Sequence, residues 1–189
     1  MSLVPAFEIG VWNAWIFMVW LLIQNYGIKF LNEEIYQKAG GSSEVEASPV
    51  QKITGYISVA LWLLTTVYSI FLPLKLGTIW FHIGLIVFSI GMIINIIATI
   101  NFVSTPIKEL VVKGIYRYSR HPMYLAMLLI YLSVGIASAS WIFMLVTVLW
   151  LVLIMLGVKD EEQYCLDKYD EVYREYMLRT PRWIGIPKA

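Results

Sequence analysis

The residues best suited to chemistry in this sequence of 189 residues form two short polar clusters. The first, residues 108–124, holds Arg120, His121 and three tyrosines at the start of an apolar stretch. Pro122 suits the first turn of a helix, so a helix N-terminus would point toward whatever Arg120 and His121 hold. A guanidinium, an imidazole and a helix N-terminus all favour an anion, so this corner suits a ligand that bears a carboxylate.

The second cluster, residues 159–162, follows the apolar stretch and contains the neighbouring carboxylates Glu161 and Glu162. If the stretch folds back as a helical hairpin, the two clusters face each other. Successive residues on a helix point about 100° apart, so we expect one glutamate in the site and the other toward solvent or an arginine. A zwitterionic or cationic small molecule suits this arrangement better than a metal does. A simple ion pair between these glutamates and Arg117 or Arg120, without any ligand, explains the spacing as well as a binding site does.

The composition indicates a membrane protein. Hydrophobic residues make up 59% of the chain and charged residues only 14%, whereas about a quarter of the residues of soluble domains are charged. The net charge of +1 gives no reason to expect a nucleic-acid partner. One cysteine and two histidines exclude an internal disulfide and argue against a metal site. We therefore expect an integral membrane protein in contact with membrane lipids, without metal or nucleic acid.

The lengths of the charge-poor stretches give the number of crossings. Residues 10–28, 53–74 and 76–101 each suffice for one crossing of about 20 residues. Residues 121–158 carry no Asp, Glu, Lys or Arg and would form a helix of about 57 Å, nearly twice the hydrocarbon core. Small and turn-compatible residues at 133–140 suit a tight turn in the middle of this stretch. The sequence thus predicts five transmembrane helices, the last two as a tight hairpin.

Positive charge supports that number and sets the orientation. With five crossings, 13 lysines and arginines lie on one side of the membrane and 1 on the other, whereas four crossings give 7 on each side. Lysine and arginine mark the cytoplasmic side, so the N-terminus is predicted outside and the C-terminus in the cytoplasm. The membrane would be the cell membrane, or the endoplasmic reticulum of a eukaryote.

The whole chain is predicted to be an all-α, multi-pass membrane protein with a cytoplasmic, amphipathic C-terminal helix. That helix covers residues 159–178 and carries Tyr169, Tyr173 and Tyr176 on one stripe. The stripe favours packing on the membrane surface or on neighbouring loops over direct catalytic contact. Residues 1–100 would form three transmembrane helices with a flexible cytoplasmic loop at 39–50, and residues 101–189 would form the region that binds a cofactor and catalyses.

The motifs of the C-terminal half resemble those of a known enzyme family. They are Gly114-Ile-Tyr-x-x-x-Arg-His-Pro-Met-Tyr124, the Glu161-Glu162 pair at hairpin distance, Tyr173-x-x-Tyr176 and Arg179-x-x-Arg182. The pattern is similar to the isoprenylcysteine carboxyl methyltransferase and phospholipid N-methyltransferase group of integral membrane enzymes, over roughly residues 101–187. The first two predicted helices carry no motif.

The resemblance implies S-adenosyl-L-methionine as methyl donor and a lipophilic small molecule or lipid as acceptor, either a lipid amine or a prenylcysteine-like carboxylate. His121 and the helix N-terminus beside it would hold the methionine carboxylate, and Glu161 would pair with the cofactor's amino group or ribose. A catalytic role would fall to Glu162, which could take the proton of an amine acceptor, and to Arg120. The implied cofactor contacts are Asn101, Lys108, Glu109, Leu110, Val111, Tyr116, His121, Pro122, Met123, Tyr124 and Glu161.

One departure from the family pattern and two other classes of protein bear on this prediction. Gly157 stands where carboxyl methyltransferases of the group place an arginine that faces substrate, which argues against the isoprenylcysteine branch. An NADPH-dependent membrane reductase of the sterol or steroid type shares the His-Pro-x-Tyr corner but is usually longer. A non-enzymatic lipid-binding protein would use the basic segment only to hold headgroups.

Overall fold

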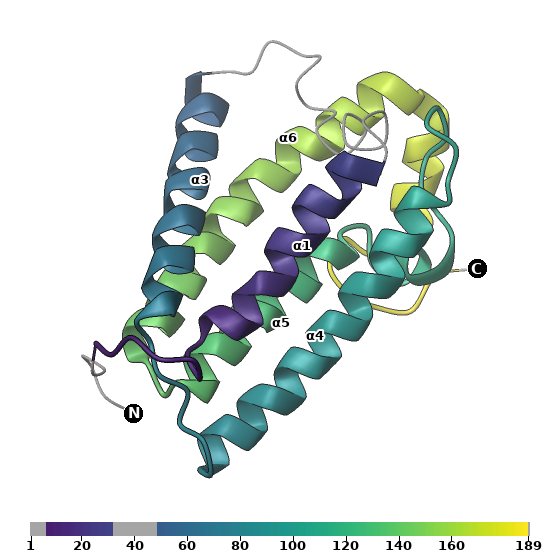
Figure 1. Ribbon diagram of the computed structural model, residues 1–189. Coiled ribbons are helices and arrows are strands. Elements are labelled where there is room, and N and C mark those ends of the chain that lie inside the picture. Colours follow the sequence, from purple (N-terminus) through teal and green to yellow (C-terminus); the bar gives the residue numbers. More distant parts are fainter. Residues whose placement is uncertain (1–6, 32–48, 189) are drawn as a thin grey trace.

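The computed structural model of the protein describes residues 7–31 and 49–188, which form a bundle of helices (Figure 1). In chain order these are α1 (Trp15–Leu31), α3 (Pro49–Ile70), α4 (Ile79–Val103), the short 3-10 helix η2 (Gly114–Arg117), α5 (Pro122–Ala137) and α6 (Trp141–Arg179). No strand occurs within these described ranges, where Asn13 and Pro73 make one isolated bridge. The predicted all-α class is confirmed. Of the predicted flexible loop 39–50, residues 39–48 lie outside the described residues.

Three of the helices are long and apolar enough to cross a membrane. Among the described residues these are α3, over Lys52–Ile70, and the helices α4 and α6. Trp15–Gln24 of α1 and the whole of α5 are shorter apolar segments. The protein is thus an integral membrane protein. That α1 and α5 also cross the membrane, for five crossings in all, stays a prediction.

Small residues bring α4 and α5 into close contact. Gly84, Gly91 and Ala98 recur at every seventh position of α4, so they lie on one face of the helix and are buried there. A Cβ added at Gly84 would lie within 3 Å of Ala137, and one at Gly91 within 3.1 Å of the Ala126 carbonyl. Without side chains at these positions the two backbones can pack directly, as is common between membrane helices.

Polar side chains join α1 to α4 within the apolar region. The indole of Trp20 donates to the Asn95 side-chain oxygen at 3.1 Å, and the Gln24 amide donates to the Thr99 hydroxyl at 2.8 Å. Amides in a bilayer are costly unless paired, so such contacts fix neighbouring helices to each other.

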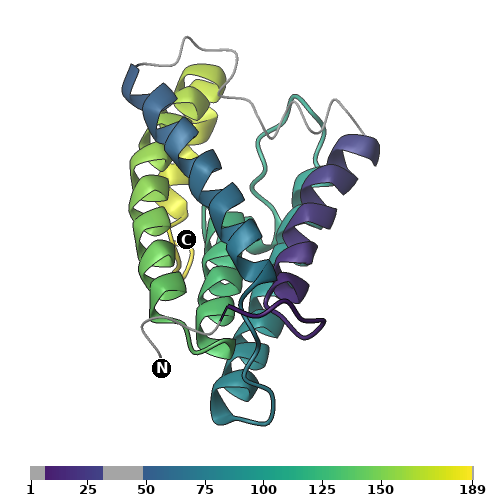
Figure 2. The same ribbon diagram turned by 60° about the vertical axis from the view of Figure 1, so that its left-hand side comes forward.

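Backbone hydrogen bonds close the end of the bundle where α1 begins and α3 ends. The Ala14 amide donates to the Leu72 carbonyl at 2.9 Å, and the Lys75 amide donates to the Ala137 carbonyl at the end of α5 at 2.9 Å. Figure 2 shows this end at the bottom and the bent C-terminal part of α6 at the top. We call the opposite end, where α3 begins and α4 ends, the site end.

The predicted hairpin is present, and its turn is short. Helix α5 ends at Ala137 and α6 begins at Trp141, with Ser140 capping α6 through a hydrogen bond from the Phe143 amide. The predicted C-terminal helix over 159–178 is present as the last part of α6, which runs on from the hairpin and is kinked at Asp170, where φ is 42°. After the kink, the last turns of α6 bend back over the site end (Figure 1).

Candidate functional site

The loop between α4 and α5 is shaped by a glycine at its centre. Gly114 has a φ of +60°, which side chains rarely tolerate, and a Cβ there would collide with the Asn101 side chain. The Asn101 side-chain oxygen instead accepts a hydrogen bond from the Ile115 amide at 3.0 Å. This contact anchors η2 to the end of α4 and sets the position of Tyr116.

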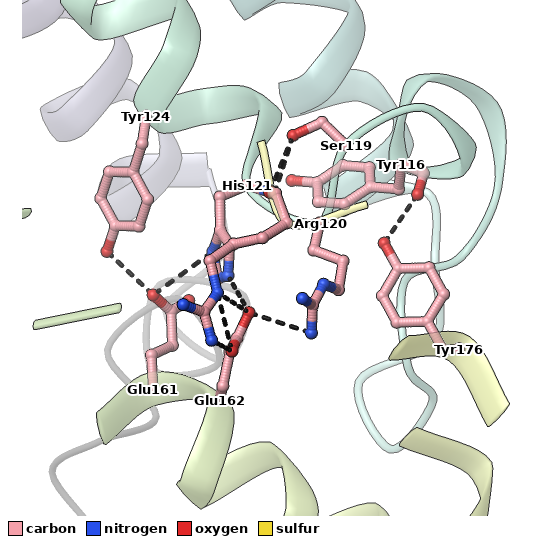
Figure 3. Close-up of polar contacts among 9 residues, drawn as sticks. Tyr116, Ser119, Arg120, His121, Tyr124, Glu161, Glu162 and Tyr176 are labelled. Atoms are coloured by element: carbon pink, nitrogen blue, oxygen red, sulfur yellow. Dashed lines mark hydrogen bonds and ion pairs between the residues drawn. The ribbon is translucent and has the colours of Figure 1, made fainter. Parts of the chain in front are cut away.

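The segment after α6 holds the other side of the same loop. The Arg120 amide donates to the Pro181 carbonyl at 3.0 Å, and the Gly185 amide donates to the Tyr118 carbonyl at 3.0 Å. The Tyr176 hydroxyl donates to the Tyr116 carbonyl at 2.7 Å (Figure 3). Tyr176 of the tyrosine stripe therefore packs on a neighbouring loop, while Tyr169, Tyr173 and Tyr176 also line the cavity described below.

Glu162 lies at the centre of the site, between two arginines and a histidine. Its Oε1 lies 3.1 Å from Nη1 of Arg120 and 3.1 Å from Nε2 of His121 (Figure 3). Arg182 donates to both of its oxygens. The side chain is 4% exposed. Burial alone raises its pKa, but hydrogen bonds from His121 and Arg182 and the charge of Arg120 outweigh burial and lower the pKa to about 2. Glu162 is therefore ionised at neutral pH.

Glu161 has a different environment from its neighbour. Its side chain is 43% exposed, and Oε2 accepts a hydrogen bond from the Tyr124 hydroxyl at 3.0 Å. Nδ1 of His121 lies 3.8 Å from the same oxygen (Figure 3). His121 thus stands between the two glutamates, and its Nε2 carries the hydrogen donated to Glu162 because an ionised carboxylate only accepts.

Arg120 is a buried guanidinium with donors to spare. Its side chain is 9% exposed, and among the residues that the structure describes neither Nε nor Nη1 has a hydrogen-bond partner. The contact of Nη1 with Glu162 is thus an ion pair at 3.1 Å without hydrogen-bond geometry. Glu162 thus supplies the counter-charge of this guanidinium, and Arg120 is also among the residues that line the cavity described next.

A cavity of about 580 Å³ adjoins these residues, a size typical of sites for small ligands. Its polar part is lined by Arg120, His121, Glu161 and several tyrosines, and its apolar part by Trp150 and Ile154. Burial raises the pKa of Tyr116 in the polar part, so its hydroxyl stays protonated and can donate a hydrogen bond.

The cavity brings together most of the site residues predicted from sequence, namely Glu109, Leu110, Val111, Tyr116, Arg120, His121, Tyr124 and Glu161. The other predicted residues are not among the lining. Asn101 holds the loop, Lys108 is exposed, and Pro122 is buried in the first turn of α5. Met123 packs on the cluster of Ala98, Val111 and Tyr116, and Glu162 contacts Arg120, His121 and Arg182.

Sequence analysis did not assign a role to Arg182. The spacing Arg179-x-x-Arg182 was part of the motif, and it was the available signal for this residue. Only the backbone pairing of the C-terminal segment with residues 118–120 brings the Arg182 guanidinium to Glu162. No group of three or more His, Cys, Asp or Glu side chains that could hold a metal occurs within residues 7–31 and 49–188.

The family model described as phospholipid methyltransferase matches residues 74–172, which is 99 of the 189 residues. The matched region includes α4, the loop with Arg120 and His121, α5, and α6 as far as Glu171 and Val172. Helices α1 and α3 and the C-terminal segment with Arg182 lie outside the match. No curated protein matches the chain.

Proposed function

The chain belongs to the phospholipid methyltransferase family, and from this membership we propose that it is an S-adenosyl-L-methionine-dependent methyltransferase acting on a lipophilic acceptor. Membership of this family indicates a membrane methyltransferase that acts on lipid-like substrates. The proposal adds the cofactor, the residues that hold it, and the side of the membrane. The observation that carries it is the cavity of about 580 Å³, which is lined by Arg120, His121 and Glu161.

The residues around the cavity fit this cofactor. S-adenosyl-L-methionine carries a carboxylate, and Arg120, His121 and the N-terminus of α5 supply two cationic or donor groups and a helix terminus for it. The cofactor also carries an amino group and a ribose, which suit the exposed carboxylate of Glu161. The loop residues Glu109 to Val111 and Tyr116 would line the remainder of the cofactor site.

When bound, S-adenosyl-L-methionine supplies a methyl group on a sulfonium, and an amine or carboxylate acceptor displaces the sulfur in line. The protein chiefly has to orient donor and acceptor and to exclude water. Glu162 supports this by fixing Arg120 and His121, because one carboxylate contacts both side chains. Its burial and complete ion pairing support a positioning role for it.

An amine acceptor must lose a proton before it attacks, and the site offers a carboxylate for that proton. Sequence analysis assigned the proton to Glu162, whose pKa of about 2 makes it a weak base. Glu161 lines the cavity and is half-exposed, and the Tyr124 hydroxyl holds its carboxylate in place. We assign the proton of an amine acceptor to the Glu161 oxygen that the cofactor does not contact. A carboxylate acceptor would need no base.

We place the reaction at the cytoplasmic face and the catalytic region in residues 101–189. The imbalance of 13 lysines and arginines against 1 supports this orientation, because the site end is then the positively charged end. The family match to residues 74–172 supports a methyltransferase over the NADPH-dependent reductase.

The test is methyl transfer by the purified protein in lipid nanodiscs. Protein is incubated with S-adenosyl-L-methionine labelled in the methyl group, and radioactivity is counted in the lipid extract. The wild type transfers label, and His121→Ala loses at least about tenfold in rate, since a charged hydrogen bond contributes roughly 1.5 to 3 kcal/mol. Glu175→Gln is the matched control, because Glu175 is exposed, makes a 3.7 Å ion pair with Arg179 and is not among the residues that line the cavity. A folded wild type that transfers no label to any lipid contradicts the proposal.

A further inference from the structure

The apolar part of the cavity lies between two helices, and one of them is outside the family match. Thr54, Gly55 and Ser58 of α3 line it on one side. Leu153, Ile154 and Gly157 of α6 line it on the other. Because the family match begins at residue 74, α3 is a part of this site that family membership does not explain.

The two helices are close at one end and separated at the other. Figure 1 shows α3 and α6 drawing apart toward the site end, where α3 begins. Away from the site end, the inner face of α3 is buried at Thr65 and Ser69. Nearer the site end, Gly55 and Gly157 each have no atom within 4 Å of the place where a Cβ would lie. Both glycines are exposed and both line the cavity, so the cavity continues between the two helices as an open slot.

Aromatic stacking closes the deep end of this slot. Trp150 of α6 is 6% exposed and stacks on Tyr131 of α5, with ring centroids 4.9 Å apart and planes inclined by 12°. Eleven residues of α6 separate Trp150 from Glu161, a rise of about 16 Å. The slot thus runs from the polar site to a fixed aromatic floor.

We propose that the slot formed by Gly55, Ser58, Trp150, Leu153, Ile154 and Gly157 holds an alkyl chain of the acceptor lipid. This inference rests on the proposed function and adds how the acceptor is bound. The slot lies within membrane-spanning helices, and its rims carry lipid-facing side chains such as Ile57, Val152 and Leu156. Hydrocarbon therefore surrounds the slot, and a lipid chain can enter it sideways while the head group of the lipid stays in the polar part of the cavity.

Physical chemistry indicates what such a slot would do. A chain that moves from the bilayer into the slot exchanges one apolar environment for another, so it gains little from the hydrophobic effect. The gain is orientation, because a chain held between α3 and α6 fixes where the head group sits relative to the cofactor site. The slot should therefore act on selectivity for chain length and on kcat/KM, with no effect on cofactor binding.

The test fills the slot without disturbing packing. Gly157→Trp and Gly55→Trp each place an indole into open space from opposite walls. Gly27→Trp is the matched control, because Gly27 of α1 also has nothing within 4 Å and does not line the cavity. Each protein is assayed with dioleoyl- and dihexanoyl-phosphatidylethanolamine in the same detergent micelles. Binding of S-adenosylhomocysteine, the demethylated cofactor product, is measured by calorimetry.

The expected result is a loss of at least tenfold in kcat/KM for the dioleoyl lipid with either slot variant. The dihexanoyl lipid changes less than threefold, the S-adenosylhomocysteine affinity stays within twofold, and Gly27→Trp behaves as the wild type. An unchanged ratio between the two lipids, in a variant that still binds S-adenosylhomocysteine, overturns the inference. If a tryptophan variant fails to fold, Gly157→Leu is held to the same criterion. Failure of the proposed function looks different, because the wild type itself then binds no S-adenosylhomocysteine and transfers no methyl group.

Discussion

Replacing Glu162 by glutamine removes one negative charge from between Arg120, His121 and Arg182 while keeping the shape of the side chain. The ordinary pKa of 4.5 is lowered to about 2 in the folded protein. This difference corresponds to about 3 kcal/mol of stability at neutral pH. Removing one partner of a buried ion pair costs about 3 to 5 kcal/mol, and the low end applies here because the Arg182 side chain is 39% exposed to solvent. The pKa difference and the cost of breaking a buried ion pair both predict that Glu162→Gln lowers the free energy of unfolding by about 3 kcal/mol.

The pH dependence of that loss follows from the direction of the shift. A carboxyl whose pKa is lower in the folded state stabilises the protein fully above its unfolded pKa of about 4.5, and the stabilisation disappears as the pH falls toward 2. The difference between wild type and Glu162→Gln is therefore constant from about pH 8 to pH 6. It shrinks below about pH 5.

Thermal unfolding followed by the fluorescence of the 8 tryptophans measures this effect. A loss of about 3 kcal/mol lowers the unfolding temperature by about 6 to 12 °C in a protein of this size. Glu161→Gln is the matched control, since its side chain is 43% exposed and the change should cost less than about 1 kcal/mol. Equal losses for the two glutamine variants, or a loss for Glu162→Gln that does not shrink with acid, would refute the electrostatic account of the site.

Two further substitutions test how glycines shape the bundle. Gly114→Ala places a side chain at a φ of +60° and against Asn101. We expect a destabilisation of about 1 to 3 kcal/mol and a weaker affinity for S-adenosylhomocysteine, measured by calorimetry. An unchanged affinity would show that the loop does not set the geometry of the site. Gly91→Leu overpacks the contact of α4 with α5 and should cost about 1 to 3 kcal/mol in thermal unfolding. Gly27→Leu, in open space on α1, should change stability by less than about 0.5 kcal/mol, and equal effects of the two leucines would argue against close packing at Gly91.

The hairpin and the facing clusters could be predicted because they depend on local features of the sequence. A charge-free run from 121 to 158 is too long for one crossing, and small residues mark where it turns. Once the turn is placed, geometry brings Arg120 and His121 to the glutamate pair. The contacts of Glu162 with Arg120 and with His121 result from this hairpin.

The course of the chain after residue 158 was harder to predict. The change from apolar to charged residues at Lys159 marks the end of the apolar part, but residues such as Lys, Glu and Gln are good helix formers, so α6 simply continues. The kink at Asp170 depends on distant contacts, because the turns after it are held by Tyr176 against the Tyr116 carbonyl. No periodic pattern encodes such a contact.

The roles of Arg182 and of helix α3 in the site could not be found from sequence, because they also depend on long-range contacts. Arg182 reaches Glu162 only because the C-terminal segment pairs with the loop backbone, which is a long-range contact. Helix α3 contributes small residues and a glycine to the cavity, and these residue types are common in any membrane helix. Their role follows from where α3 lies and not from what they are.

The most direct test of the central claim is calorimetric titration of the detergent-purified protein with S-adenosylhomocysteine and, in parallel, with NADPH. We predict saturable binding of S-adenosylhomocysteine alone, weakened at least about tenfold in His121→Ala by the loss of a charged contact. Binding of NADPH alone would assign the protein to reductase chemistry, and binding of neither ligand by a folded sample would favour a non-enzymatic lipid-binding protein. Either of these two results would contradict the account.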